Sequence, residues 1–517
     1  MAQQLSTINL VAPAFKGVNT EDSPIAQDPS FAEIADNAII DKRGRIASRK
    51  GYSVLTTDRS ELLNTTPNPD VYEPVRAIAE FKDSVGNTKI FSVGNNKILS
   101  GTTTLADETP GSYTITADNW KMVNFNDKIY FFQRGYEPLV YDNAGGSVVK
   151  LSTVTGAAGV ASAMYGNEVL SAYGRLWTAD FTADKSTIYW SDLLIGHDWS
   201  GGTSGSIDIS KVWPDGYDEI VALAAHNGLL IIFGQHSIVV YQGAEAPATM
   251  SLSDTVAGVG CVDRDTVQHT GTDVLFLSHT GLRSFGRTIQ EKSMPISTLS
   301  KTITKDLISL IQDENSFYRT VYSPEENFYL LTFVGQSTTY CFDLRGALED
   351  GSLRVTRWPS SVFSAYERLQ NGKLYVGSDQ GISEYKGYQD NGESFRFKYY
   401  SPSLTFGDAS KLKFIKKIKP TIIGASGEVA SIKFAYDFDG TYRSVAFNVP
   451  SAGAGAEFNV AKFNIDEYSG TTQQVVRKAL NATGSGSTVV VGLEADIDGN
   501  ALSLQEINIL ALVGKTV

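Results

Sequence analysis

The stretch GLLIIFGQHSIVVYQG, residues 228–243, decides how the chain folds. Two apolar runs flank a short polar turn that contains His236, and this pattern is typical of a β-hairpin. Six further stretches share the pattern, at intervals of roughly 40 to 55 residues, which is the range for propeller blades. They are KIFSVGNNKILSG from Lys89, KIYFFQRGYEPLVYD from Lys128, RLWTADFTADKSTIYWSD from Arg175, DVLFLSHTGLRSFG from Asp273, NFYLLTFVGQSTTYCFD from Asn327 and KLYVGSDQGISEYKG from Lys373.

Most copies also follow another short strand and a tight turn, as EIVALAAHNG precedes the opening stretch. A sheet of three or four such strands buries both faces when copies pack radially around an axis. The sequence therefore predicts an all-β chain with a six- or seven-bladed β-propeller over residues 75–387. An N-terminal arm, residues 1–74, could donate the strand that closes the ring. A β-solenoid is less favoured because its coils are shorter and more regular.

The arm is predicted to contain one short helix, SFAEIADNAII, residues 30–40. Ser30 stands at the N-cap and Glu33 at the capping-box position. A second helix is predicted for STLSKTITKDLISLI, residues 297–311, with an apolar stripe of Leu299, Ile303, Leu307 and Leu310. We expect this stripe to pack against the propeller rim, with docking on a neighbouring subunit as the alternative.

From residue 388 the repeat stops and successive strand patterns predict a β-sandwich over residues 388–517. Two turns, Asp437-Phe-Asp439-Gly440 and Asp496-Ile-Asp498-Gly499, resemble the start of a calcium loop. An EF-hand also needs a bidentate Glu at its twelfth position, and neither turn supplies one. We interpret both as ordinary hairpin turns.

Motifs that carry chemistry are missing from the sequence. Its five histidines, His197, His226, His236, His269 and His279, lack metal-ligand spacing such as His-x-x-x-His. Cys261 and Cys341 are too few for a disulfide framework, which favours a reducing compartment. There is no nucleophile elbow and no phosphate loop. We predict no catalytic, cofactor or metal site and no enzymatic activity, although carboxylate pairs from distant blades would escape this search.

The chain carries a net charge of −13, which argues against wrapping nucleic acid tightly. The basic stretch DKRGRIASRK holds Lys42, Arg43, Arg45, Arg49 and Lys50. We interpret it as a solvated loop or a subunit interface, with a nucleic-acid site as the alternative. No apolar run approaches the roughly 20 residues that a membrane span needs, and the N-terminus lacks a signal-peptide pattern, so no membrane insertion is expected.

Two blocks resemble the tail nozzle or tail hub (tail tubular) proteins of short-tailed bacteriophages. FKGVNTEDSPIAQDPSFAEIADNAIIDKRGRIASRKGY, residues 15–52, is similar in its Gly-Val-Asn start, its Ser23-Pro24 pair, Asn37 before a short strand, and Gly44, Arg49 and Gly51. Residues 220–287 follow the family pattern over a longer span, and the C-terminal strands ending LQEINILALVGK are also similar.

The resemblance implies a structural virion protein in the tail, assembled in the host cytoplasm. It would form a homo-oligomeric ring, a hexamer in the family, joined to the portal adaptor. Such a ring extends the DNA ejection channel and carries tail fibre or tail needle proteins. Acidic channel walls would repel genomic DNA and let it slide without specific binding. The alternatives are a glycan-binding or glycan-degrading propeller, marked by convergent carboxylates or arginines at its centre, and a cellular scaffold propeller.

Overall fold

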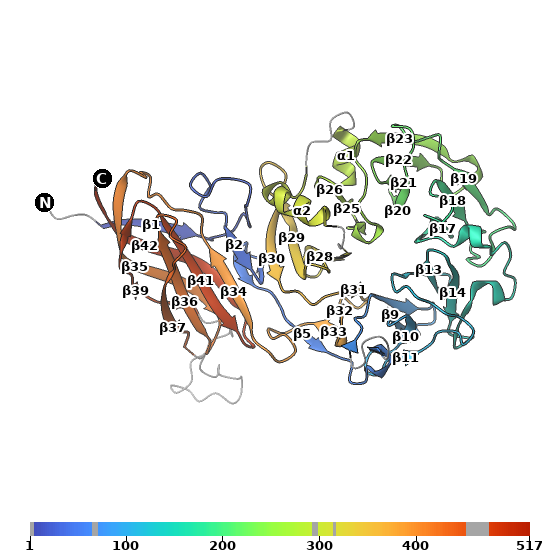
Figure 1. Cartoon of the computed structure of the whole chain (residues 1–517), viewed down its shortest axis with the longest axis horizontal. Helices are drawn as coiled ribbons and strands as arrows, with labels where there is room; N and C mark the ends of the chain where they lie inside the picture. The colour runs from blue at the N-terminus through green and yellow to red at the C-terminus, as the bar shows by residue number, and fades with distance from the viewer. Residues whose placement is uncertain (1–4, 65–70, 292–297, 314–316, 451–474, 517) are drawn as a thin grey trace, which may run out of the picture.

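The computed structural model describes residues 5–64, 71–291, 298–313, 317–450 and 475–516, and consists of a β-propeller beside a β-sandwich (Figure 1). Within these residues, seven antiparallel sheets follow one another around the propeller, six with four strands and one with three. This arrangement confirms the predicted fold class. We number the sheets as blades in chain order. Blade 1 is β8 (Ala77–Lys82), β9 (Thr88–Gly94), β10 (Lys97–Ser100) and β11 (Ala106–Asp107); blade 2 is β12 (Lys121–Phe125), β13 (Lys128–Gln133), β14 (Tyr136–Asp142) and β15 (Val148–Lys150); blade 3 is β16 (Glu168–Ala172), β17 (Arg175–Ala179), β18 (Thr187–Trp190) and β19 (Gly205–Asp208).

Blade 5 is the three-stranded sheet, and blade 7 takes one strand from the N-terminal segment. Blade 4 is β20 (Ile220–His226), β21 (Leu229–Gly234), β22 (Ser237–Gln242) and β23 (Ser251–Ala257); blade 5 is β24 (Gln268–His269), β25 (Val274–Ser278) and β26 (Gly281–Ser284); blade 6 is β27 (Tyr318–Ser323), β28 (Phe328–Phe333), β29 (Thr338–Ala347) and β30 (Leu353–Pro359); blade 7 is β31 (Ala365–Arg368), β32 (Leu374–Ser378), β33 (Gly381–Tyr385) and β5 (Tyr52–Val54).

The hairpins singled out in the sequence are the central strand pairs of the six four-stranded blades and the last two strands of blade 5. In blade 4, Ile232 pairs with Val239 and both side chains are fully buried. Every residue of β21 after Leu229 is buried, because neighbouring blades cover both faces of the sheet. The continuous apolar run LLIIF follows from that two-sided burial.

The ring closes through the N-terminal segment, as the sequence allowed. Tyr52 and Val54 of β5 pair with Tyr385 and Ser383 of β33, so the outer strand of blade 7 comes from the other end of the propeller chain. The inner strand of blade 7, β31, contacts β8 of blade 1. Early and late parts of the chain thus hold each other in one blade.

The sandwich has two sheets around one shared core. The first contains β1 (Leu5–Val11), β3 (Ala38–Ile40), β4 (Ile46–Ser48), β35 (Lys411–Gly424), β38 (Val475–Arg477), β39 (Leu480–Asn481), β40 (Ser485–Gly486) and β42 (Leu502–Thr516). The second contains β34 (Phe395–Tyr400), β36 (Val429–Tyr436), β37 (Arg443–Asn448) and β41 (Val489–Ile497). Inward residues such as Ile415, Ile509, Ile432 and Val491 are fully buried or nearly so.

One short strand links the sheets of the two bodies. β2 (Ile34–Asp36) lies between β30 of blade 6, which it meets in parallel, and β34 of the sandwich, to which it is antiparallel. The blade and the sandwich sheet thereby form one continuous nine-stranded sheet. Asp36 also forms an ion pair with Arg357, at 2.9 Å between oxygen and nitrogen. The connection is therefore hydrogen-bonded backbone and not a free linker.

The helix predicted for residues 30–40 is wrong. This segment forms β2 and β3, separated by Asn37, whose φ of 51° lies in the left-handed region and ends any right-handed helix. The two strands pair in different sheets, β2 with β34 and β3 with β4. Sheet pairing with distant strands has overridden a local capping pattern.

The second helix is confirmed in part. α2 spans Thr304–Ile311 and follows a 3-10 turn over Lys301–Ile303, whereas Ser297 lies outside the described residues. Leu299, Ile303 and Leu307 are buried together with Leu282 of β26, so the stripe packs on the propeller. A shorter helix, α1 (Phe285–Glu291), follows β26 directly, and the small pair β6 (Leu63–Asn64) and β7 (Val71–Tyr72) precedes blade 1.

Candidate functional site

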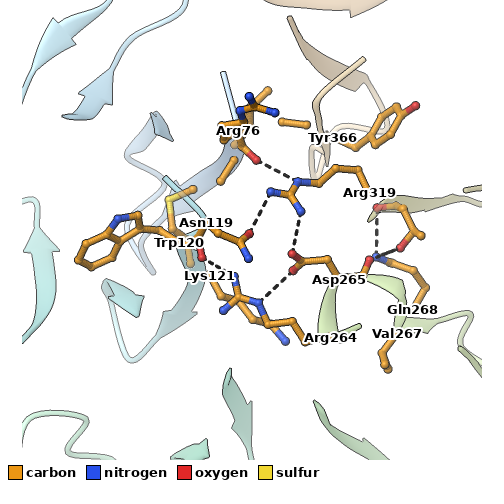
Figure 2. Close-up of a pocket in the computed structure, with 15 residues that line it drawn as sticks. Arg76, Asn119, Trp120, Lys121, Arg264, Asp265, Val267, Gln268, Arg319 and Tyr366 are labelled. Atoms are coloured by element: carbon orange, nitrogen blue, oxygen red, sulfur yellow. Dashed lines mark hydrogen bonds and ion pairs between the residues drawn. The ribbon is translucent and has the colours of Figure 1, made fainter. Parts of the chain in front are cut away.

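Polar side chains from five blades meet at the propeller axis (Figure 2). They line a cavity of about 160 Å³. We call Arg76, Asn119, Arg264, Asp265 and Arg319 the axial cluster. Arg76 precedes β8, Asn119 precedes β12, Arg264 and Asp265 lie in a 3-10 turn before β24, and Arg319 lies in β27. The inner strands therefore position every member of the cluster.

The guanidinium of Arg319, in blade 6, hydrogen-bonds to residues of three other blades. It donates to the carboxylate of Asp265 at 2.9 Å, to the side-chain oxygen of Asn119 at 2.9 Å and to the backbone oxygen of Arg76 at 3.0 Å. Arg264 donates to the backbone oxygens of Asn119 and Asn167 and lies 3.3 Å from Asp265. Both arginines thus direct their guanidinium groups at other residues of the chain. The resulting network of hydrogen bonds and ion pairs crosses the propeller axis.

Carboxyl groups near the axis have shifted pKa values with a physical cause. Burial raises the pKa of Asp263 to about 6, and the charge of Asp265 adds to the rise. Burial would also raise the pKa of Asp265, but Arg264 and Arg319 hold it below its ordinary value. Burial next to Glu80 raises the pKa of Glu367 to about 8. Shifted carboxyls in a cavity are a signature of functional sites, although structural networks produce it too.

Their contacts favour a structural role. Glu168 is fully buried and raised in pKa by burial, and it pairs with Lys121 at 2.6 Å while accepting from the backbone of Leu223 at 3.2 Å. It thereby links blades 2, 3 and 4. Glu367 accepts from the backbone of Glu80 at 3.2 Å and links blade 7 to blade 1. These acids fasten neighbouring inner strands to each other.

Arginines do converge at the centre, which is the observation expected of a glycan-active propeller. Only Arg76 keeps its guanidinium free of hydrogen bonds and ion pairs with the residues that the structure describes. Burial lowers its pKa, it lies over the ring of Phe317 at 6.0 Å, and its side chain points away from Asp265 (Figure 2). It also borders a second cavity, of about 420 Å³.

The histidines form two pairs that sequence reasoning missed. Nδ1 of His226 lies 3.1 Å from Nε2 of His269, and the rings of His236 and His279 stack with centroids 5.3 Å apart. The two members of each pair are 43 residues apart in sequence. That shared interval between adjacent blades was the signal that could have found them. His197 is separate, and burial lowers its pKa.

The two Asp-rich turns use their carboxylates internally. Asp437 accepts from the backbone of Thr488 at 2.9 Å, and Asp439 accepts from the backbone of Thr441 at 3.0 Å. Asp498 accepts from Gln389 at 2.7 Å. Across the described residues, no group of three or more His, Cys, Asp or Glu side chains is placed to hold a metal ion.

The interpretation of the basic stretch 41–50 as a solvated loop is wrong for Arg45 and Arg49, whose side chains are buried, and the subunit-interface interpretation stays a prediction. Arg45 pairs with Asp41 at 2.7 Å, Arg49 pairs with Asp390 at 2.6 Å, and Lys50 pairs with Glu326. Arg49 also lies over the ring of Phe395, at 4.1 Å from its centroid. These side chains form ion pairs within the chain, where the arm, the propeller and the sandwich meet.

Both cysteines are free thiols and buried. Burial raises the pKa of Cys261 to about 12 and raises that of Cys341 as well, so neither is an activated nucleophile. Among the helices that the structure describes, none combines the length and the apolar character that crossing a membrane requires.

No family model matches the sequence, and no curated protein matches it by sequence. Solved structures resemble its fold at low identity. The extracellular domain of a putative one component system from B. thetaiotaomicron shares 11% identity over 68% of this chain, with a TM-score of 0.41, and this chain covers 45% of that one. The Pan2 WD40 domain of Neurospora crassa shares 9% identity over 60% of this chain and 88% of its own, with a TM-score of 0.34. The WD40 propeller domain of Doa1 shares 14% over 65% and 96%, with a TM-score of 0.27. These likenesses concern the propeller fold alone.

Proposed function

We propose that this chain is a structural, ring-forming protein of the tail nozzle of a short-tailed bacteriophage. Residues 15–52, which carry the N-terminal resemblance to that family, supply the strands that join the propeller to the sandwich. A continuous sheet across two bodies suits a part that transmits load between neighbouring subunits. The internal use of Arg264, Arg319 and Glu168 agrees with a role in architecture.

The observation that carries the proposal is the segregation of charge along the chain. Residues 388–517 contain 13 basic and 13 acidic side chains, so the net charge of −13 lies entirely within residues 1–387. Two surfaces of unlike charge on one molecule favour head-to-tail contacts between copies. Such contacts generate a ring when the rotation from each copy to the next closes on itself.

Five of the 13 basic side chains in residues 388–517 lie on the single strand β35. Lys416 and Lys417 of β35 are exposed, Lys419 is half-buried, and none of the three forms an ion pair with the described residues. They lie on the face opposite the core, because Ile415 before them and Ile418 among them are buried in it. We call Lys416, Lys417 and Lys419 the lysine row.

Apolar side chains accompany the lysine row. Phe414, which is 38% exposed, pairs with Leu512, and Lys417 pairs with Leu510. Apolar groups among cations suit a protein surface better than a phosphate backbone, since interfaces combine an apolar centre with a polar rim. The acidic part of a second copy is the partner that this surface fits.

The axial cluster bears on the path of DNA. Hydrogen bonds cross the propeller axis, so we place the DNA ejection channel between copies of the chain and not through a propeller. An acidic lumen would let genomic DNA slide. The portal adaptor below and tail fibre or needle proteins at the rim complete the proposed assembly.

The test is self-association of the purified chain, followed by mass photometry at low and at 0.5 M salt. We expect rings that weaken with salt, and loss of rings in the triple variant Lys416→Glu, Lys417→Glu, Lys419→Glu. The matched control changes three exposed lysines elsewhere, Lys42, Lys82 and Lys211, to Glu. Equal loss in both variants would show that total charge, and not the lysine row, governs assembly. A wild-type chain that stays monomeric with its tail partners would defeat the nozzle proposal.

A second candidate function rests on Arg76. Its unpaired guanidinium beside Phe317 and a cavity of about 420 Å³ suits a glycan that bears a carboxylate, because a guanidinium binds a carboxylate through two parallel hydrogen bonds. Binding of acidic oligosaccharides, measured by calorimetry for wild type and Arg76→Gln, tests it. Binding that is lost in the variant would favour a receptor-recognising tail component, and no binding to wild type would remove this candidate.

A further inference from the structure

The seam between blades 4 and 5 has a histidine pair at each end. His226 closes β20 and His269 closes β24, the inner strands of the two blades. His236 and His279 lie in the next turns of the same blades, after β21 and β25. Each strand therefore runs from one pair to the other, and the two pairs bracket the seam.

The seam between the pairs is apolar. Phe233 of blade 4 and Phe276 of blade 5 pack with ring centroids 4.8 Å apart, and both are fully buried. Ile231, Ile238 and Val274 belong to the same core. Water and charge are excluded from the middle of the seam, so its ends are the places where a proton can enter.

The contact of the first pair needs one ring nitrogen to accept, so the two rings cannot both be imidazolium ions while it is made. The backbone N–H of Gly271 donates to Nδ1 of His269 at 3.0 Å, so that nitrogen carries no proton. Nε2 of His269 then carries the hydrogen and donates to Nδ1 of His226 at 3.1 Å. The side-chain amide of Asn227 meets the remaining nitrogen of His226 at 3.0 Å. A proton added at either Nδ1 sets N–H against N–H.

The second pair opposes charge in another way. The imidazole rings of His236 and His279 are stacked at 28° between planes, so two imidazolium ions would face each other with their centroids only 5.3 Å apart. Burial lowers the pKa of His279, and the neighbouring His236 lowers it further. Burial and His226 likewise lower the pKa of His269.

Other charged groups near the pairs act in the opposite direction and are already engaged. Asp273 would favour a charged His269, but its carboxylate accepts from Gly286 at 2.9 Å and from Ser284. Asp218 would favour a charged His279, but it accepts from the backbone of His236 at 2.9 Å and from Ser237 at 2.8 Å. Neither carboxylate forms an ion pair with a histidine.

We propose that the two histidine pairs make the blade 4–blade 5 seam an acid-sensitive joint that is closed at neutral pH and opens below about pH 6. The sign follows from the lowered pKa values of His269 and His279. Their contribution to closure is complete above the ordinary histidine pKa of about 6.5 and is lost as the pH falls below it. The joint requires only the fold, so it does not depend on the proposed nozzle function.

The test is hydrogen–deuterium exchange of the full chain at pH 7.5, 6.5 and 5.5, corrected for the intrinsic exchange rate. Two histidines with an ordinary pKa of about 6.5 in the open state raise the open population up to about thirtyfold between pH 6.5 and 5.5, since each contributes up to about fivefold over that interval. We expect this increase in peptides from β20 to β26 and not in peptides from blades 1 and 2.

Variants separate the histidine pairs from general acid loosening. The quadruple change of His226, His269, His236 and His279 to Asn should exchange at the same rate at all three pH values, whereas His197→Asn should behave as wild type. If the quadruple variant fails to fold, exchange at the imidazole C2 hydrogens of the wild-type chain gives each pKa directly. Seam exchange that does not change with pH, acid opening that persists in the quadruple variant, or ordinary pKa values for all four histidines would overturn the proposal.

Discussion

Replacing Arg319 by Met tests whether the axial cluster holds the propeller together. The variant keeps an unbranched side chain but removes the donors to Asp265, Asn119 and Arg76. Breaking a buried ion pair from one side costs about 3–5 kcal/mol. Arg264 remains 3.3 Å from Asp265, and the Asp265 side chain is 19% exposed, so we expect a loss of about 2–3 kcal/mol.

The assay is thermal unfolding with a matched control. Because the entropy of unfolding scales with chain length, a loss of this size in a chain of 517 residues lowers the melting temperature by about 2–3 °C. Arg368→Met removes another arginine from the propeller, one that forms a pair with Glu325 in which both side chains are more than a third exposed. Such surface pairs contribute about 0–1 kcal/mol to the free energy of unfolding, so the melting temperature of the control variant should hardly change.

A second substitution identifies the cause. Asp265→Asn in the Arg319→Met background removes the carboxylate that lost its partner, and part of the stability should return. Two results would refute the reasoning. One is a melting temperature for Arg319→Met equal to that of Arg368→Met, and the other is strict additivity of the Arg319 and Asp265 changes.

Three further predictions follow from particular contacts. Ile232→Asp places an unpaired charge at a fully buried position of blade 4, so circular dichroism should show loss of the folded propeller, and unchanged thermal stability would contradict the assigned core strand. Gly51→Ala should destabilise the junction of the arm with the propeller and the sandwich, because the new Cβ would lie 1.8 Å from the carbonyl oxygen of Gln389. Gly440→Ala meets open space and should be neutral in the same melting assay. Glu367→Gln should raise the melting temperature at pH 8 more than at pH 5. The pKa of Glu367 is raised to about 8 in the folded state, so the folded state loses stability as the pH rises from about 4.5. An equal effect of the substitution at both pH values would contradict that pKa.

The blade repeat could be predicted because the apolar pattern of each hairpin shows by itself that its strands are buried. Runs such as LLIIF in β21 are apolar throughout, and tight turns separate them, so the strands and their order followed from local pattern. The closing strand β5 was anticipated only as a possibility, since its pairing with β33 spans most of the chain.

The misjudged parts depend on distant partners. Residues 30–40 have a good local helix signal, and only β30, β34 and β4 convert them to strands. Arg49 looked solvated because Asp390 lies far away in sequence. The histidine pairs were hidden in the same way, although their shared 43-residue interval could have exposed them.

Electron cryomicroscopy of the chain, alone and mixed with the portal adaptor and tail fibre proteins that the proposed nozzle would join, tests the central proposal most directly. The account predicts a closed ring in which the lysine row of each copy contacts acidic residues of the next, around a central channel formed between copies. Particles that remain monomeric propellers in every mixture, or a ring whose lysine row faces solvent, would contradict it.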